Sequence, residues 1–303
     1  MPPTSQHRWA VALLFITPAL WSVNYLVGRM APGQVAPHML ALLRWSLAGL
    51  VLAVFAWPEL WAKRAVLGQH AWRYFVLGGL GMWMCGAWVY IGARSTTATN
   101  IALIYALSPV FIALASALWL REHLGKLQWL GIALALVGLV HVVIKGQWGQ
   151  LSQVQFVAGD VWILGCTVAW TLYCLLLTRW PSDLSSLARL VLIVAGGVTL
   201  LLPLALAEAV SGLPMTHTVW NAKTAWLVVA AALMPGAGAY LAYATVQKQL
   251  GAARASLTLY LGPLYAALAA WAVLGEPIRA YHVVGATVIL PAIYLASRSS
   301  TAP

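Results

Sequence analysis

The spacing of charged residues is the feature of this chain that most limits its fold. A helix that crosses a bilayer needs roughly 20 mostly apolar residues. Nine stretches, each at least 18 residues long, contain no Lys, Arg, Asp or Glu, and Arg44 alone interrupts a tenth candidate at 30–58. The nine stretches are residues 9–28, 74–93, 95–120, 127–144, 161–178, 190–207, 224–247, 255–275 and 280–297. We therefore expect ten transmembrane helices joined by short loops.

The composition supports a membrane protein and excludes several other classes. Charged residues make up 8% of the chain and hydrophobic residues 62%, whereas soluble domains are about 25% charged. Strands of an outer-membrane barrel would alternate apolar and polar residues, and these runs do not alternate. The predicted fold class is therefore all-α integral membrane, which excludes a soluble enzyme and a nucleic-acid-binding domain.

The basic residues also predict the orientation. With a cytoplasmic N-terminus, the inner segments would hold eleven Lys and Arg residues and the outer segments five. The eleven are Arg8, Lys63, Arg64, Arg73, Arg121, Lys126, Arg179, Arg189, Lys248, Arg254 and Arg298. The five are Arg29, Arg94, Lys145, Lys223 and Arg279. Because cytoplasmic loops carry the excess of Lys and Arg, we expect both termini in the cytoplasm.

The two halves of the chain resemble each other at a constant offset of 154 positions. This offset relates Pro109 to Pro263, Glu122 to Glu276 and Gly131 to Gly285. Weaker echoes, at slightly shorter offsets, relate Trp21-Ser22 to Trp170-Thr171 and Arg44 to Arg189. The halves are predicted to be residues 1–150 and 151–303, with five helices each. Because five is odd, the second copy enters from the opposite side of the membrane. Such inverted-topology repeats are typical of secondary transporters, which work by alternating access.

Several short motifs resemble those of EamA-type members of the drug/metabolite transporter superfamily. They are Trp21-Ser22-Val23-Asn24-Tyr25; Ser108-Pro109-Val110 with Leu120-Arg121-Glu122; and, in the second copy, Gly262-Pro263 with Leu274-Gly275-Glu276-Pro277. Within the superfamily, the length and the Trp and Tyr content look like YddG-type exporters of aromatic amino acids. The resemblance implies a central cavity, peripheral fifth and tenth helices, and efflux of small metabolites across the bacterial inner membrane.

Deep aromatic residues are the main candidates for binding a solute. On the third helix, Gly79, Trp83, Gly86 and Tyr90 share a spacing that predicts one face, and Ala232, Gly236, Ala239 and Tyr243 repeat it on the eighth. Either close helix packing or a cavity wall would explain such faces. The predicted cavity residues are Asn24, Trp83, Tyr90, Tyr105, Trp170, Tyr173, Tyr243 and Tyr260.

Three charged positions leave two interpretations each. Arg44 is the one charge inside a span; snorkelling toward the nearer interface is somewhat favoured over binding a substrate carboxylate. Glu122 and Glu276 are either gate ion pairs or, more often in such positions, helix-end anchors with basic neighbours.

The paired prolines Pro109 and Pro263 fall near midspan of symmetry-related helices. A proline frees a carbonyl and kinks a helix. The two residues are therefore candidates for hinges that open and close the two gates, with static curvature as the equal alternative.

The predicted function is export of small amphipathic metabolites, above all aromatic or hydrophobic amino acids. An exporter of drugs or organic cations, with Trp and Tyr supplying cation–π contacts, is the alternative. A membrane-embedded lipid enzyme is disfavoured because the six acidic residues all fall at predicted helix ends. We expect no cofactor, no metal and no nucleic-acid partner. The sequence leaves the coupling ion and the oligomeric state open, and a monomer is compatible with it.

Overall fold

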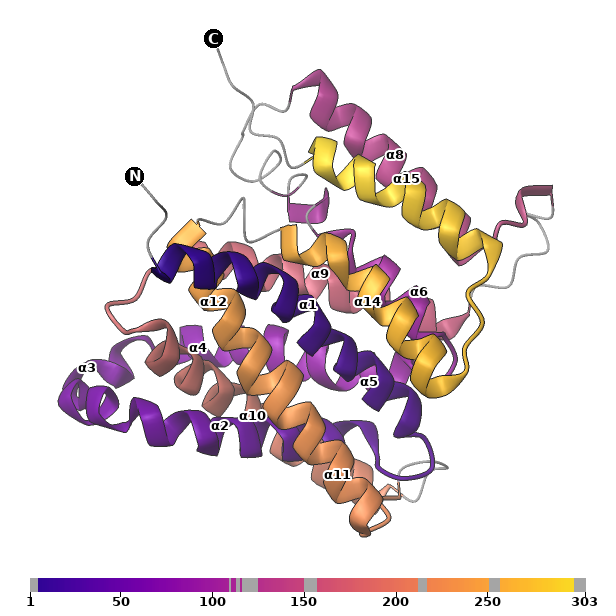
Figure 1. Ribbon diagram of the computed structural model, residues 1–303. Helices are drawn as coiled ribbons and strands as arrows, with labels where there is room; N and C mark the ends of the chain where they lie inside the picture. Colours follow the sequence, from indigo (N-terminus) through magenta and orange to yellow (C-terminus); the bar gives the residue numbers. More distant parts are fainter. Residues whose placement is uncertain are drawn as a thin grey trace.

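A computed structural model describes residues 5–108, 110–112, 115, 125–149, 157–211, 217–250 and 257–296. These residues form ten helical spans (Figure 1). The predicted boundary between the repeats, at residues 150 and 151, lies outside this part of the chain, as do Pro109 and Glu122.

The first five spans begin with two long helices and include one composite helix. They are α1 (Ser5–Met30); α2 (Pro37–Ala62); α4 (Ala71–Gly78) continued by the π-helical η2 (Gly79–Trp88) and α5 (Val89–Gly92); α6 (Ala98–Tyr105); and α8 (Lys126–Val143). Two short segments, α3 (Arg64–Leu67) and η1 (Gly68–His70), connect the second span to the third.

The second five spans repeat this order, including the composite helix in third place. They are α9 (Ala158–Arg179); α10 (Ser186–Val210); α11 (Ala222–Ala231) continued by the π-helical η4 (Ala232–Gly238) and α12 (Ala239–Leu250); α14 (Leu257–Leu274); and α15 (Ala280–Ala296). A π segment at the same place in both repeats widens the helical turn there, because its hydrogen bonds run from residue i to i+5.

The outer surfaces of the helices suit a bilayer. On α2, the side chains of Leu50, Val54 and Phe55 are 68%, 71% and 72% exposed. On α14, Trp271 is 61% exposed. Apolar faces of this extent are costly in water and are satisfied by lipid. Five described spans are long and apolar enough to cross a membrane, from Pro37–Ala62 to Ala222–Val246, and shorter apolar helices accompany them.

The helices of the two halves pack in a pattern with two-fold symmetry. The first span, α1, packs on α12 and α14, and its counterpart α9 packs on η2 and α6. The second spans, α2 and α10, pack on each other, and so do the fifth spans, α8 and α15. The main contacts between the halves therefore have a partner contact or map onto themselves, as expected for two five-helix repeats of inverted topology.

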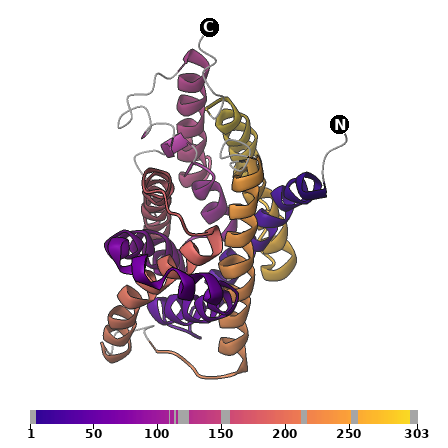
Figure 2. The ribbon, with the colours of Figure 1, turned by 90° about the vertical axis from the view of Figure 1, so that its left-hand side faces the viewer.

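The pair α8 and α15 stands apart from the main bundle. The two helices lie side by side in the upper part of both views (Figures 1 and 2). Their buried side chains, which include Ile132, Ala135, Ile289 and Ala292, form a small core with residues of α6. The main core joins α1, α2, α6, α9, α10 and the third and eighth spans around fully buried side chains such as Trp45 and Leu77. The fifth and tenth helices are thus peripheral.

Candidate binding pocket

A partly open pocket lies between the halves, among α1, α2, η2, α6, α9, η4 and α12. It encloses about 520 Å³ not filled by protein atoms, its open mouth included. The pocket is lined by Trp21, Asn24, Tyr25, Arg44, Cys85, Tyr105, Ser108, Trp170, Pro235 and Tyr240.

Three aromatic rings from three helices form one wall of the pocket. Trp21 of α1, Trp170 of α9 and Tyr240 of α12 meet edge to face, with ring centroids 5.9–6.4 Å apart. Edge-to-face packing is a favoured arrangement of aromatic pairs. The sequence comparison pairs Trp21 with Trp170, so the two rings join the first spans of the two repeats.

A second aromatic pair lies on the other side of Asn24. Tyr25 of α1 and Tyr105 of α6 stack with ring centroids 6.1 Å apart. Asn24 is only 9% exposed and lines the pocket. The wall around it therefore combines apolar ring surface with a few polar atoms.

The charged residue among those that line the pocket is Arg44, which is 3% exposed. Its Nη1 donates to the Asn24 Oδ1 in a close hydrogen bond and to the Tyr90 hydroxyl at 2.8 Å. The Tyr90 hydroxyl in turn donates to the same Asn24 oxygen at 2.8 Å. The guanidinium also lies over the rings of Trp45 and Tyr90, 4.6 and 5.4 Å from their centroids.

The snorkelling favoured for Arg44 from the sequence is wrong. The side chain stays inside the bundle because an amide, a phenol and two ring faces replace water around one side of it. Its Nε is buried and has no hydrogen-bond partner within the described part of the chain. A buried, incompletely paired cation is costly, so a negatively charged group in the pocket would be stabilised.

The structure brings some of the predicted cavity residues to the pocket and leaves others behind its wall. Asn24, Tyr105 and Trp170 line it directly. Tyr90 supports Arg44, Tyr173 stacks on Trp170 at 5.2 Å, and Tyr243 lies 5.3 Å from the Trp21 ring. Tyr260 belongs to α14, but its side chain lies outside the described side chains.

The two helix faces predicted from the sequence run through the π segments. On the third span, Trp83 packs against Trp88 at 6.0 Å, while Tyr90 reaches Arg44. On the eighth span, Tyr240 rather than Tyr243 lines the pocket. A spacing of 3.6 residues does not hold across η2 and η4, because i→i+5 hydrogen bonding makes a wider turn. Trp83 and Tyr90 therefore have different neighbours, and the shared face of each set of four residues stays a prediction.

Some lining residues were not chosen as site candidates from the sequence. Trp21 and Tyr25 flank Asn24 in the same motif, and Ser108 precedes Pro109 in another. Their membership of these motifs was the sequence signal that could have identified these three residues. Cys85 and Pro235 lie in the π segments, whose positions the sequence did not reveal. Among the described residues, no group of three His, Cys, Asp or Glu side chains gathers in a way that could hold a metal.

Comparison with known proteins identifies the family. The model of the EamA-like transporter family matches residues 8–144 and again residues 157–298. The chain belongs to the EamA-like transporter family. The two matches, one to each half, agree with two five-helix repeats. This EamA-like protein is therefore a multi-pass membrane transporter of the drug/metabolite superfamily and not an enzyme.

Individual relatives are similar over almost the whole chain. "Uncharacterized transporter YyaM" of Bacillus subtilis is 28% identical over 90% of this chain and 88% of its own length. A "probable terminal-alkyne amino-acid exporter" of Streptantibioticus cattleyicolor is 24% identical over 97% and 94%. One protein crystal structure superposes with a TM-score of 0.66 at 20% identity, covering 95% of this chain and 96% of the other. This EamA-like protein is thus a secondary transporter of small metabolites.

Proposed function

We propose that this transporter exports amino acids with aromatic or other apolar side chains from the bacterial cytoplasm across the inner membrane. The observation that carries the proposal is the buried Arg44 in the wall of a pocket lined mainly by aromatic rings. The guanidinium would contact one end of the solute, and the aromatic rings would contact the other end.

Arg44 suits the carboxylate end. An ionisable residue inside a membrane bundle is a functional-site candidate by default. A guanidinium binds carboxylates through parallel hydrogen bonds, and the Nε of Arg44 has no partner in the described residues. Asn24 and Tyr90 hold the Nη1 atom, which fixes the orientation of the guanidinium plane before the solute enters.

The aromatic walls suit the side-chain end. Trp21, Trp170 and Tyr240 offer ring faces and edges, and Tyr25 with Tyr105 adds a second aromatic surface. Aromatic contacts contribute about 0.5–1.5 kcal/mol each beyond the burial of apolar area. An aromatic or aliphatic side chain would therefore be bound in preference to a charged one.

The charge of the pocket argues against the alternative substrate class, organic cations. Among the described residues that line the pocket there is one cation, Arg44, and no carboxylate. A quaternary ammonium would meet that cation in a partly dehydrated space, where like charges repel strongly. An amino-acid exporter among the relatives adds support for carboxylate-bearing solutes.

We assign roles to the candidate residues accordingly. Asn24, Tyr105 and Trp170 would contact the solute, Tyr90 would hold Arg44, and Tyr173 and Tyr243 would support the rings of Trp170 and Trp21. Trp83 and Tyr260 remain candidates from the sequence alone. We also propose the orientation with both termini in the cytoplasm, on the basis of the eleven-to-five distribution of Lys and Arg.

Counterflow into proteoliposomes tests the proposal. Vesicles preloaded with unlabelled phenylalanine should accumulate labelled phenylalanine, and a labelled quaternary ammonium should not accumulate in vesicles preloaded with the same cation. Counterflow of the cation without that of phenylalanine would overturn the proposal. Net uptake with and without a pH gradient then separates proton-coupled transport from facilitated diffusion.

A further inference from the structure

We propose that Arg29 and Glu276 form a gate that closes the pocket toward the face of the molecule at which α1 ends, called here the Arg29 face. The inference goes beyond the choice of solute, because it requires only that the protein transports by alternating access. In the proposed orientation the Arg29 face is the outer one.

The ion pair joins the two repeats. The Nε of Arg29, near the end of α1, lies 2.8 Å from the Glu276 Oε1, just after α14. These residues are 247 positions apart in the chain. Glu276 thus pairs across the repeats, and not with its sequence neighbour Arg279, which carries no ion pair among those described.

Two further hydrogen bonds extend the pair to the start of α6. The Nη1 of Arg29 donates to the Ala93 carbonyl at 2.9 Å, and the Ala98 amide donates to the Glu276 Oε2 at 3.2 Å. We call these four residues the Arg29 cluster. It connects the ends of α1 and α14 with the segment between α5 and α6, so separation of the repeats at this face must break the two contacts of Glu276, with Arg29 and with the Ala98 amide.

The Arg29 cluster lies directly above the pocket along two of the pocket-lining helices. Arg29 follows Tyr25 by four residues on α1, and Tyr105 follows Ala98 by seven on α6. Residues four or seven apart share one face of a helix. Tyr25 and Tyr105 stack on each other in the pocket wall. The cluster therefore covers the pocket about one to two turns beyond this pair.

Close backbone packing completes the closure at the same face. A Cβ on Gly28 would lie 3.0 Å from the Ala93 Cβ, and one on Gly159 would lie 2.4 Å from the Gly92 carbonyl oxygen. Next to Gly159, the Asp160 Oδ1 accepts a 2.5 Å hydrogen bond from the Thr96 hydroxyl. The segment between α5 and α6 is therefore held from both sides, by α1 and by α9.

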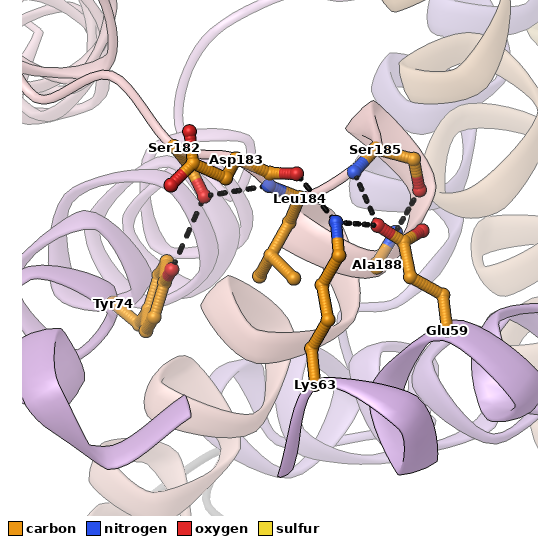
Figure 3. Close-up of polar contacts among 8 residues, drawn as sticks. All are labelled: Glu59, Lys63, Tyr74, Ser182, Asp183, Leu184, Ser185 and Ala188. Carbon is orange, nitrogen blue, oxygen red and sulfur yellow. Dashed lines mark hydrogen bonds and ion pairs between the residues drawn. The ribbon is translucent and has the colours of Figure 1, made fainter. Parts of the chain in front are cut away.

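The opposite face carries a different kind of contact between the repeats (Figure 3). Lys63, at the end of α2, points to the Glu59 carboxylate at 3.0 Å and to the Asp183 carbonyl at 2.6 Å. The Glu59 Oε1 also accepts from the Ser185 amide at 2.8 Å. These contacts join α2 to the start of α10 and include none of the pocket-lining segments of α1, α6 or α12. This second pair serves as a control.

The native Cys85 reports the state of the gate, because it lines the pocket. Cys166 and Cys174 would be replaced with Ser to leave one thiol. We expect Arg29→Ala and Glu276→Ala to raise labelling of Cys85 by a membrane-impermeant methanethiosulfonate from the Arg29 face by up to about fivefold, since ion pairs contribute up to about 1 kcal/mol. The measurement is made on intact cells and on inverted vesicles, and it needs no substrate.

Two controls and one rescue define the outcome. Arg279→Ala removes the same charge three residues from Glu276, and Lys63→Ala breaks the pair at the other face; neither should raise labelling from the Arg29 face. The swap Arg29→Glu with Glu276→Arg should lower the labelling again. Unchanged labelling in both single variants, or an equal rise in Arg279→Ala, would contradict the gate.

A cross-link tests the same gate without weakening the fold. Arg29→Cys with Glu276→Cys, in a background without the native cysteines, is joined by a short bifunctional thiosulfonate. Cross-linking should stop counterflow, and reduction should restore it. Full counterflow in the cross-linked protein would overturn the proposal, whereas absence of any counterflow before cross-linking points to the choice of solute.

Discussion

Arg44 lies near the start of the second span and Arg189 near the start of the seventh, yet they have different partners. The Nη2 of Arg189 donates to the carbonyls of Leu177 and Trp180 at the end of α9. The guanidinium of Arg44 binds a neutral amide and a phenol in the pocket wall. Carbonyls at a helix C-terminus carry partial negative charge and stabilise a cation, and an amide with a phenol does so less.

The difference shows how two similarly placed arginines acquire two uses. In the second repeat the arginine closes a helix end, where two carbonyls accept hydrogen bonds from its Nη2. In the first repeat the arginine lines a pocket. The Nε of each arginine is buried and has no hydrogen-bond partner among the described residues. The residues around each arginine therefore decide whether its charge is available to a solute.

The strongest test separates the two arginines. Arg44→Gln should lower kcat/KM for phenylalanine counterflow about 30-fold or more, because removal of one partner of a buried charged contact costs 2 kcal/mol or above. Arg189→Gln should leave kcat/KM nearly unchanged and lower thermal stability by about 1 kcal/mol, through the lost hydrogen bonds. Arg44→Lys should be intermediate. Equal losses of transport in both Gln variants would remove the proposed distinction.

A second test varies the solute and not the protein. If Arg44 provides the main charged contact, 3-phenylpropionate should inhibit phenylalanine counterflow within about tenfold of phenylalanine itself, since a cation–π contact of the missing ammonium contributes only about 1 kcal/mol. Phenethylamine, which lacks the carboxylate, should be at least about 30-fold weaker. Inhibition by the amine and not by the acid would indicate that Arg44 does not select the charge.

The smallest effect on transport is expected at the paired prolines, where the two repeats should behave alike. We propose that Pro109 and Pro263 act as paired hinges; Pro263 lies inside α14. Replacement of either with Ala supplies an amide donor for a free carbonyl, which stabilises a straighter helix by about 1 kcal/mol. The rate of counterflow should fall about fivefold in each single variant. Unchanged rates in both variants would leave static curvature as the role of the prolines.

Much of the architecture followed from the sequence. Gaps between charges predicted ten spans, and the constant offset of Pro, Glu and Gly predicted the duplication that the family matches bear out. The pocket was only partly foreseen. Asn24, Tyr105 and Trp170 were selected and line it, whereas on the eighth span Tyr240 lines it and Tyr243 packs against the ring of Trp21.

The sequence by itself determined that this chain is a duplicated membrane bundle. A charge is costly in lipid at any position of a span, whichever helices the span packs against, so the uncharged stretches mark the spans. Only the tertiary structure decided that Arg44 stays inside and that Glu276 pairs with Arg29 and not with a neighbour in its own loop. The reason is that a polar side chain in a membrane protein is stabilised by whichever groups other helices bring to it. Those groups lie tens to hundreds of residues away in the chain, and the sequence does not show which of them come close together in space.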